Sequence, residues 1–319
     1  MEARNRSSIV ILLILIVFAS VFFLTFPSSG LPWATRSVEC PKVLPYSYDH
    51  YSGLDGRQNS SGSPPCRGRA NLLQHSTDTS QSGRLIHGPC QRSRVKILTS
   101  CDPSTEHKDV SIKNKVLYAK LQQYDFEWWV AAYQAPAGQK PRPPIWTKTA
   151  LLLEALGDRA EGDSPYDWLI WLDCDSVVAR YDMTIEDIAG EELNNPAKDI
   201  FITKDAHGWN SGIVVLRVSE WNLALFRRIW ASEQYIDDVW AEQRALHHFY
   251  NTEADVRDRF VDVPQERMQY VRGAPRHKVS EAEEMDQFVV HFAGAIGHKD
   301  RLMAEYYAKI QQSGAWMKR

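Results

Sequence analysis

Two aspartates one residue apart follow a short apolar run in the middle of the chain. Residues 168–178 read WLIWLDCDSVV, so five apolar or aromatic residues precede Asp173 and Asp175, and another apolar pair closes the segment. An apolar run of this length is typical of a buried strand in a parallel sheet. The two carboxylates would then lie at the carboxyl end of the strand, where open α/β sheets bind ligands. Together they could hold a divalent cation that neutralises a diphosphate.

Two chemistries use such an element. One is glycosyl transfer from a nucleotide sugar, in which the metal holds the diphosphate leaving group. The other is the haloacid-dehalogenase type of phosphatase, whose motif Asp-x-Asp-x-(Thr/Val)-(Leu/Val) is also matched by residues 173–178. A third interpretation needs no ligand, because aspartates are common in solvated turns at strand ends. The spacing of the two aspartates does not distinguish these alternatives.

The elements that must position the aspartates lie in residues 94–319, where strand and helix patterns alternate. Strands are expected at 94–99, 126–131, 201–202 and 213–216, in addition to the run before Asp173. Helices are expected near 109–123, from Trp146 to a C-cap at Gly157, after an N-cap at Ser219, and over 238–250. This alternation indicates an α/β sandwich with a mainly parallel sheet. The aspartate strand lies well inside the domain, whereas in the phosphatase fold it normally opens the domain.

The whole composition bounds the class of protein. With 44% hydrophobic and 24% charged residues, the chain is typical of globular proteins with a large core. A net charge of −3 gives no reason to propose nucleic acid as a partner.

The N-terminus carries a candidate membrane anchor. Residues 9–26 form an uncharged stretch of 18 residues that follows Arg4 and Arg6. As a helix they would span about 27 Å, close to the hydrocarbon thickness of early secretory membranes. A cleaved signal peptide, the alternative, usually has an apolar region of only about 7 to 15 residues. We therefore expect a single-pass type II anchor, with residues 1–8 in the cytosol and the remainder in the lumen.

Residues 27–93 are rich in Ser, Gly, Pro, Asn, Gln and Arg and show no sustained period, which predicts a flexible stem. Asn59 begins a glycosylation sequon in this stem. In an oxidising lumen the five cysteines allow one or two disulfides, and the odd number leaves a thiol or an intermolecular bridge. The connectivity stays open. The cysteines are Cys40, Cys66, Cys90, Cys101 and Cys174.

Several separated motifs agree in order and spacing with those of one known family. They are residues 111–118, 145–148, 171–175, 209–212, 242–243 and 290–294. The chain resembles glycosyltransferase family 34, which contains fungal Golgi α-galactosyl- and α-mannosyltransferases and plant xyloglucan xylosyltransferases. The resemblance covers essentially all of residues 94–319. It implies a Rossmann-like GT-A fold in a single catalytic domain, a UDP- or GDP-sugar donor, manganese dependence and retention of anomeric configuration.

The resemblance also implies roles for individual residues. The implied metal ligands are Asp173, Asp175 and His291. The implied catalytic residues are Asn210, Glu242 and Gln243. The donor-binding residues are Asp173, Asp175, Thr99, Lys115, Lys148 and Gly212. The expected reaction moves a hexose or pentose to a glycan or glycoprotein acceptor in the Golgi, by the chain alone or in a complex with other glycosyltransferases. A non-catalytic lumenal scaffold subunit is the alternative, and the phosphatase is a further one.

Glu242 and His291 can each be weighed from the residues alone. On a helix over 238–250, Glu242 points partly inward, where an unpaired carboxylate would be costly. Beside an anomeric carbon its charge could stabilise an oxocarbenium-like state, and the alternative is an ordinary first-turn acid. His291 lies in the apolar run 288–292, which predicts a strand and would also suit a core histidine with satisfied hydrogen bonds.

The sequence departs from the family's pattern in two places. Ala241 stands where some relatives have a second acid, directly before the acidic–Gln pair. Residues 295–299 differ from the polar continuation of other members, so the sequence leaves open whether His298 or Lys299 replaces a diphosphate-contacting lysine.

Overall fold

The computed structural model describes residues 79–85, 95–134, 140–160, 166–275, 278–295 and 297–314, all within the compact unit Tyr48–Arg319. The predicted cytosolic tail, the anchor at residues 9–26, most of the stem and the sequon at Asn59 lie outside the described residues, as do Cys40, Cys66 and Cys90. No helix in the described part of the chain is long and apolar enough to span a membrane.

A seven-stranded sheet forms the centre of the domain. Its strands are β1 (Gly83–Leu85), β2 (Val95–Cys101), β3 (Asp125–Val130), β4 (Trp168–Leu172), β6 (Ile200–Asp205), β7 (Gly208–Arg217) and β8 (Phe260–Asp262), in the order β1-β3-β2-β4-β7-β6-β8. Strands β3, β2, β4, β6 and β8 run in one direction, and β1 and β7 run opposite. The predicted mainly parallel sheet is confirmed.

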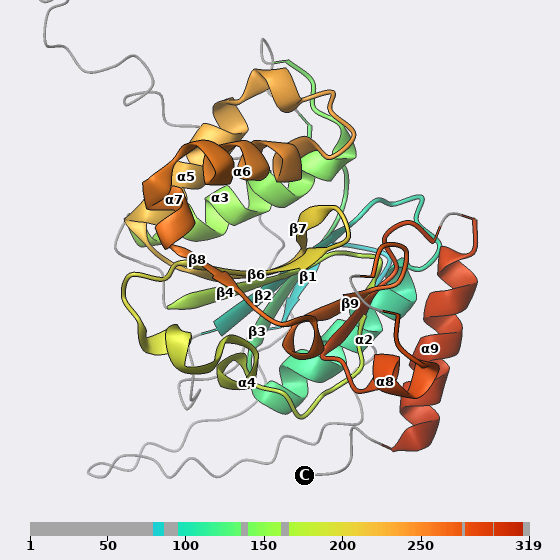
Figure 1. Ribbon diagram of the computed structural model, residues 1–319. Helices are drawn as coiled ribbons and strands as arrows, with labels where there is room; N and C mark the ends of the chain where they lie inside the picture. The colour runs from blue at the N-terminus through green and yellow to red at the C-terminus, as the bar shows by residue number, and fades with distance from the viewer. Residues whose placement is uncertain are drawn as a thin grey trace, which may run out of the picture. The chain divides into compact units, whose positions relative to one another are not determined.

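Helices cover both faces of this sheet (Figure 1). On one face lie α3 (Thr147–Ala160), α5 (Glu220–Ala231), α6 (Ala241–Thr252) and α7 (Ala254–Asp258). On the other lie α2 (Lys108–Gln122), α4 (Ile185–Ala189), α8 (Glu281–Met285) and α9 (Lys299–Ser313). Short 3-10 helices occur at Pro144–Trp146, Gly190–Asn194, Glu233–Tyr235 and Gln265–Arg267. Because both faces are covered, every residue of β4 is buried, which explains its continuous apolar sequence.

Two predicted helix ends can be compared with the structure. Ser219 caps α5 as predicted, because its side chain accepts a hydrogen bond from Asn222 N. The predicted C-cap at Gly157 is wrong, since α3 continues through this residue to Ala160. A glycine inside a helix costs only about 1 kcal/mol, and the buried apolar face of α3 outweighs that cost.

A second, three-stranded sheet has the order β5-β10-β9 and consists of β5 (Ser176–Val178), β9 (Gln269–Val271) and β10 (Val289–His291). The apolar run that contains the two aspartates is therefore not one strand. It leaves the main sheet at the end of β4 and enters the small sheet at β5, and the aspartates lie at this crossing. In the small sheet, His291 of β10 is opposite Ser176 of β5, directly after the aspartates.

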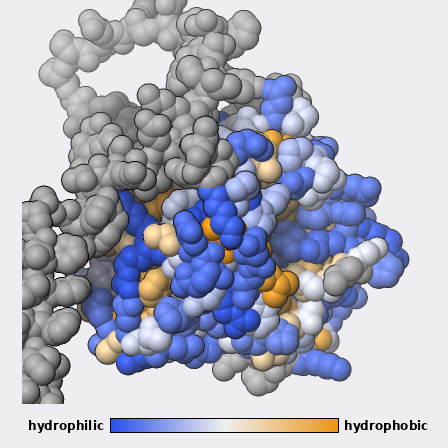
Figure 2. All heavy atoms as spheres, turned by 90° about the horizontal axis from the view of Figure 1, so that it is seen from above, coloured by the Kyte–Doolittle hydropathy of each residue, from blue (hydrophilic) through white to orange (hydrophobic). Residues whose placement is uncertain are grey.

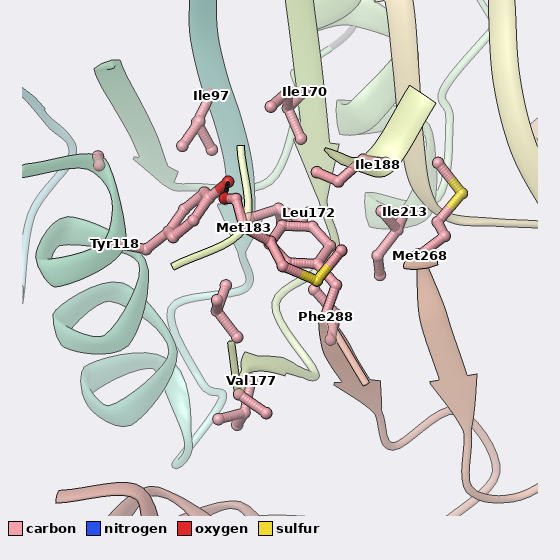
Figure 3. Packing of buried hydrophobic residues seen from close by; sticks show 14 of the residues in the cluster. Ile97, Tyr118, Ile170, Leu172, Val177, Met183, Ile188, Ile213, Met268 and Phe288 are labelled. Atoms are coloured by element: carbon pink, nitrogen blue, oxygen red, sulfur yellow. Dashed lines mark hydrogen bonds between the residues drawn. The ribbon is translucent and has the colours of Figure 1, made fainter. Parts of the chain in front are cut away.

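An apolar core fixes the small sheet against the main one (Figure 3). Ile97 of β2 and Ile170 of β4 are buried together with Tyr118 of α2 and Phe288, which precedes β10. The ring centroids of Tyr118 and Phe288 are 5.3 Å apart, and the Tyr118 hydroxyl donates a hydrogen bond to Met183 O at 2.8 Å. This packing holds in place the segment of chain that passes from the main sheet to the small sheet.

The folded region begins earlier than the predicted domain start at residue 94. Strand β1, which lies within the predicted stem, pairs antiparallel with β3 and joins it through an ion pair between Arg84 and Glu127 at 2.9 Å. A Cβ on Gly83 would lie 2.2 Å from the Trp128 ring, so the close contact of this edge strand requires glycine. A three-residue strand without a hydrophobic pattern gives no sequence signal.

Candidate active site

The loop that carries the two aspartates is tied down along its whole length. Asp173 N donates to Gly212 O in β7 at 2.8 Å, and Asp175 O accepts from Phe292 N at 2.8 Å. Between them, Cys174 forms a disulfide with Cys101 at the end of β2. One of the disulfides that the sequence allows therefore pairs Cys101 with Cys174. The main sheet, the small sheet and the disulfide together fix the two carboxylates.

Asp173, Asp175 and His291 meet at this loop, and their candidate ligand atoms all lie within 4.8 Å of one another. His291 Nε2 is 3.2 Å from Asp175 Oδ1 and 3.8 Å from Asp173 Oδ2. Adjacent ligands of an octahedral ion with bonds of about 2.1 Å lie about 3 Å apart. Two carboxylates and an imidazole suit manganese or a similar divalent cation. The three residues therefore fit the predicted metal site in both spacing and donor type.

The remaining oxygens of the two carboxylates face lysines. Lys299 Nζ is 2.7 Å from Asp175 Oδ2, and Lys148 Nζ is 3.1 Å from Asp173 Oδ1. Burial would raise the pKa of Asp175, but His291 and Lys299 outweigh this effect and hold its pKa well below the usual range. The Asp175 carboxylate therefore stays charged over the whole neutral range, as a metal ligand must.

A cavity of about 580 Å³ opens beside the carboxylates, a volume within the range of small-molecule sites. Of the predicted site residues it is lined by Lys148, Asp173, Asp175, Asn210, Gly212, Glu242, Gln243 and His291. Of the two residues that the sequence left open, Lys299 lines it as well and His298 does not. Elsewhere, the surface seen from above is mostly hydrophilic, with only small apolar patches (Figure 2). The cavity that holds Asp173, Asp175 and His291 is therefore the candidate site.

Glu242 lies in the wall of this cavity and is only 5% exposed. Its Oε1 accepts from Lys148 Nζ at 2.9 Å and from Ser211 Oγ at 3.0 Å. Its Oε2 is buried and has no hydrogen-bond partner among the described residues. A buried carboxylate oxygen without a partner is costly. Because Oε2 is buried, a ligand in the cavity would interact with the charge of this carboxylate and not through a hydrogen bond to Oε2.

The backbone in front of Glu242 is strained. Ala241, the first residue of α6, has a φ of 40°, which lies in the left-handed region that alanine rarely adopts. Its side chain is fully buried, so the acid that some relatives carry at this position would be buried here. Strained residues of this kind occur often at functional sites. The turn sets the direction in which Glu242 leaves the helix.

One family model matches almost the whole domain. It is the model of the galactosyl transferase GMA12/MNN10 family, and it matches residues 93–195 and 191–300. The chain belongs to this family. The resemblance to glycosyltransferase family 34 is thereby confirmed, and the phosphatase alternative is excluded. No curated protein sequence matches the chain.

One solved structure agrees with the fold of this GMA12/MNN10 family member, and others are less similar. A glycosyltransferase involved in the glycosylation of the major capsid of PBCV-1 is 14% identical, with a TM-score of 0.51 over 66% of this chain and 98% of that chain. The galactosyltransferase LgtC, in complex with donor and acceptor sugar analogs, is 10% identical, with a TM-score of 0.36 over 67% and 95%. Mouse xyloside xylosyltransferase 1 is 10% identical, with a TM-score of 0.37 over 62% and 97%. The first of these shows a glycosyltransferase fold.

In this family member, Asn210 and Gln243 hold the first residues of β7 next to the candidate metal ligands Asp173, Asp175 and His291. Gln243 Oε1 accepts from Ser211 N at 2.8 Å and from Ser211 Oγ at 3.1 Å, which joins α6 to β7. Asn210 Oδ1 accepts from Gly212 N at 2.9 Å. A Cβ on Gly212 would lie 2.0 Å from His291 Cε1, so the imidazole can occupy its place only beside a glycine.

Thr99 and Lys115, which were predicted to bind the donor, lie beneath the cavity and not in its wall. Thr99 Oγ1 donates to Leu172 O at 2.5 Å. Lys115 Nζ donates to Ser111 Oγ at 2.5 Å and to Ser176 O at 3.0 Å, and burial lowers its pKa to about 7. Both side chains are fully buried and bind the backbone on either side of the aspartate loop. They position this loop and have no direct path to a ligand in the cavity.

Two residues in contact with the triad were not predicted as site residues. Gln269 lies in the short strand β9, and its Oε1 is 2.9 Å from His291 Nδ1. Trp171 belongs to the motif 171–175 but was given no role of its own, and its Nε1 donates to Asp173 Oδ1 at 2.5 Å. Gln269 belongs to none of the sequence motifs, so only the three-dimensional structure links it to the site.

Proposed function

We propose that this chain is a metal-dependent, retaining glycosyltransferase. It moves a hexose or pentose from a UDP- or GDP-sugar to a glycan or glycoprotein acceptor and forms an α-linkage. The observation that carries the proposal is the convergence of Asp173, Asp175 and His291 in a cavity that Glu242 also lines. Membership of a galactosyl transferase family supports sugar transfer as the reaction class.

In this proposal Asp173, Asp175 and His291 hold Mn²⁺. When bound, the ion supplies a Lewis acid that neutralises the diphosphate leaving group. Lys299 adds a positive charge at the same edge of the cavity, and its side chain is 28% exposed. It is therefore available to bind a phosphate oxygen of the donor, the role that the sequence could not assign.

Glu242 acts on the transferred sugar. The charge of its carboxylate stabilises the positive charge that develops on the anomeric carbon as the diphosphate leaves. Lys148 anchors this carboxylate through Oε1, and the buried Oε2 has no partner among the described residues. Gln243 and Asn210 hold the first residues of β7 in place beside this carboxylate.

We further propose that the chain is a single-pass type II protein of the Golgi membrane with its catalytic domain in the lumen. The uncharged residues 9–26 and the preceding arginines support an anchor. The disulfide between Cys101 and Cys174 supports an oxidising compartment, because structural disulfides are rare in the cytosol. Complexes with other glycosyltransferases remain a prediction.

Donor hydrolysis tests the enzymatic part of the proposal. The purified chain is incubated with a panel of UDP- and GDP-sugars, with and without Mn²⁺, and the released sugar is measured. We expect manganese-stimulated hydrolysis of one donor and its loss in Asp175→Asn. A non-catalytic lumenal scaffold would release no sugar from any donor, even with the wild-type sequence.

A further inference from the structure

Gln269 is fully buried and links Asn210 to His291. Its Nε2 lies 3.2 Å from Asn210 O and 3.3 Å from Asn210 Oδ1, and its Oε1 lies 2.9 Å from His291 Nδ1. Gln269 does not line the cavity, so any effect on a ligand must pass through another residue.

The orientation of both amides follows from their partners. Asp205 Oδ2 belongs to a carboxylate and accepts hydrogen bonds, so the Asn210 atom 2.8 Å away is its amide nitrogen. Asn210 Oδ1 then accepts from Gly212 N, which can only donate. Asn210 therefore presents only acceptors to Gln269, which must turn its Nε2 toward Asn210 and its Oε1 toward His291. Each step uses a group whose role as donor or acceptor is fixed.

An amide oxygen opposite His291 Nδ1 requires a proton on Nδ1. A neutral imidazole has one N–H, so its Nε2 then carries the free lone pair. Nε2 faces Asp175 Oδ1 at 3.2 Å and Asp173 Oδ2 at 3.8 Å. With Nδ1 as a donor, Nε2 can approach these two carboxylate oxygens either with a second proton or with a shared metal cation, and metal binding displaces that proton. The proton on Nδ1 thus makes the triad a cation site.

We infer that Gln269 is a positioning residue that fixes the Nδ1–H tautomer of His291 and keeps Nε2 free for a divalent cation. This inference rests on the metal site of the proposed function. The second contact that holds the ring is Gly212, where any side chain would collide with His291 Cε1. Partners of this kind, which bind the far nitrogen of a metal-ligating histidine, typically contribute about 10- to 100-fold in metal affinity.

Two substitutions of similar size separate tautomer control from simple packing. Gln269→Met removes both hydrogen-bonding functions. Gln269→Glu keeps an acceptor for Nδ1–H but cannot donate to Asn210. Both variants lose the bonds to Asn210, so they differ mainly at His291. In the metal-free full-length chain, ¹⁵N NMR of labelled histidines reports which ring nitrogen carries the proton, and the His291 signals are assigned by their absence in His291→Ala. Calorimetric titration with MnCl₂ reports metal affinity.

We expect the Nδ1–H tautomer in the wild type and in Gln269→Glu, and loss of this preference in Gln269→Met. Affinity for Mn²⁺ should fall about 10- to 100-fold in Gln269→Met and be largely kept in Gln269→Glu. A wild-type His291 that lacks the proton on Nδ1 would overturn the inference, and so would equal losses of affinity in the two variants. If the tautomers are as expected but the wild type binds no divalent cation, the inference about Gln269 stands and the proposed metal-dependent function fails.

Discussion

Lys148 Nζ lies 2.9 Å from Glu242 Oε1, and both side chains are buried. The same ammonium group lies 3.1 Å from Asp173 Oδ1, so one cation joins the carboxylate proposed to face the sugar to a carboxylate of the metal site. Burial disfavours the charge of Lys148, but Asp173 and Glu242 outweigh this effect and raise its pKa above the usual value. Lys148 therefore stays charged at any ordinary pH and serves to position the two acids, not to transfer protons.

Removal of this cation should destabilise the fold. We expect Lys148→Met to lower the free energy of unfolding by about 3–5 kcal/mol, because two buried carboxylates lose their partner. Adding Glu242→Gln removes one of these unpaired charges. The double variant should therefore lose less unfolding free energy than the two single variants lose together. Urea unfolding of all four proteins in the cycle measures this coupling. Strictly additive effects would show that the two side chains do not interact.

Lys115 should make the stability of the protein depend on pH. In the fold, burial lowers its pKa to about 7, whereas an unfolded lysine has a pKa of about 10.4. Between these values the unfolded chain binds one proton more, so the free energy of unfolding rises with pH, by up to about 1.4 kcal/mol per pH unit. Below about pH 7 both states carry the proton and the contribution is constant.

Urea unfolding from pH 6 to 10 tests this dependence. Lys115→Met should lack the part of the slope that Lys115 contributes. Lys113→Met is the matched control, because Lys113 is exposed on the same helix and should leave the slope unchanged. An identical slope in the wild type and in Lys115→Met would contradict the buried, neutral lysine.

The comparison of Lys148 with Lys115 shows what the sequence could reveal about the site. Lys148 lies in the first turn of α3 and lines the cavity, whereas Lys115 lies in the middle of α2 and is buried beneath the cavity. Their positions depend on where the small sheet packs, and that packing is not encoded near either residue. Asp173 and Asp175 were predictable because a buried strand of five apolar residues places the residues after it at the edge of the sheet.

The long elements of the fold were predictable from the sequence, and the shortest strands were not. The alternation of strands and helices predicted the α/β class, because these elements are long and periodic. Strand β10 lies in the apolar run 288–292 that predicted a strand, but β5 and β9 have three residues each, too few to show any period. The small sheet and its residue Gln269 therefore could not be foreseen, although His291 on the same sheet was predicted from its motif.

The disulfide between Cys101 and Cys174 should contribute strongly to stability. It closes a loop with a sequence separation of 73 residues, for which the chain-entropy estimate is about 4 kcal/mol. We expect the double substitution Cys101→Ser/Cys174→Ser to lower the free energy of unfolding by a few kcal/mol. Dithiothreitol should destabilise the wild type and have little effect on the double variant, which lacks this bridge. Mass spectrometry after alkylation reports the bridge directly, and two freely alkylated thiols at Cys101 and Cys174 would contradict it.

Asp175→Asn should abolish most manganese-dependent turnover while leaving the fold intact. The substitution keeps the size of the side chain but removes the charge that would hold the cation, and the loss of one metal carboxylate costs several kcal/mol of transition-state stabilisation in this proposal. Asp255→Asn is the control, because the Asp255 side chain is 68% exposed and far from the triad in sequence. Activity is measured against Mn²⁺ concentration, with circular dichroism as a check on the fold. Near wild-type turnover with an unchanged manganese dependence would remove Asp175 from the metal site.

The product should keep the α configuration of the donor, and Glu242→Gln should slow transfer far more than it weakens donor binding. Glutamine can still accept from Lys148, so the side chain stays in place and only its negative charge is lost. That charge acts mainly when positive charge develops on the sugar, and the loss of one such preorganised group typically costs about 10²–10³ in kcat. The donor dissociation constant should change little, because the ground-state donor carries no charge at the anomeric carbon.

Proton NMR of the fresh product reports the anomer, and calorimetry reports donor affinity for Glu242→Gln. Glu220→Gln is the matched control, since Glu220 is an exposed acid in the first turn of α5 and has only the helix-dipole role. If Glu242 has this role alone, the two variants will transfer sugar at the same rate and lose similar, small amounts of stability. A β-linked product would refute the retaining mechanism. A slow Glu242→Gln beside an unaffected Glu220→Gln, with unchanged donor affinity in both, would instead assign the effect to the transition state, because both substitutions remove a negative charge from the first turn of a helix and only Glu242 lines the cavity.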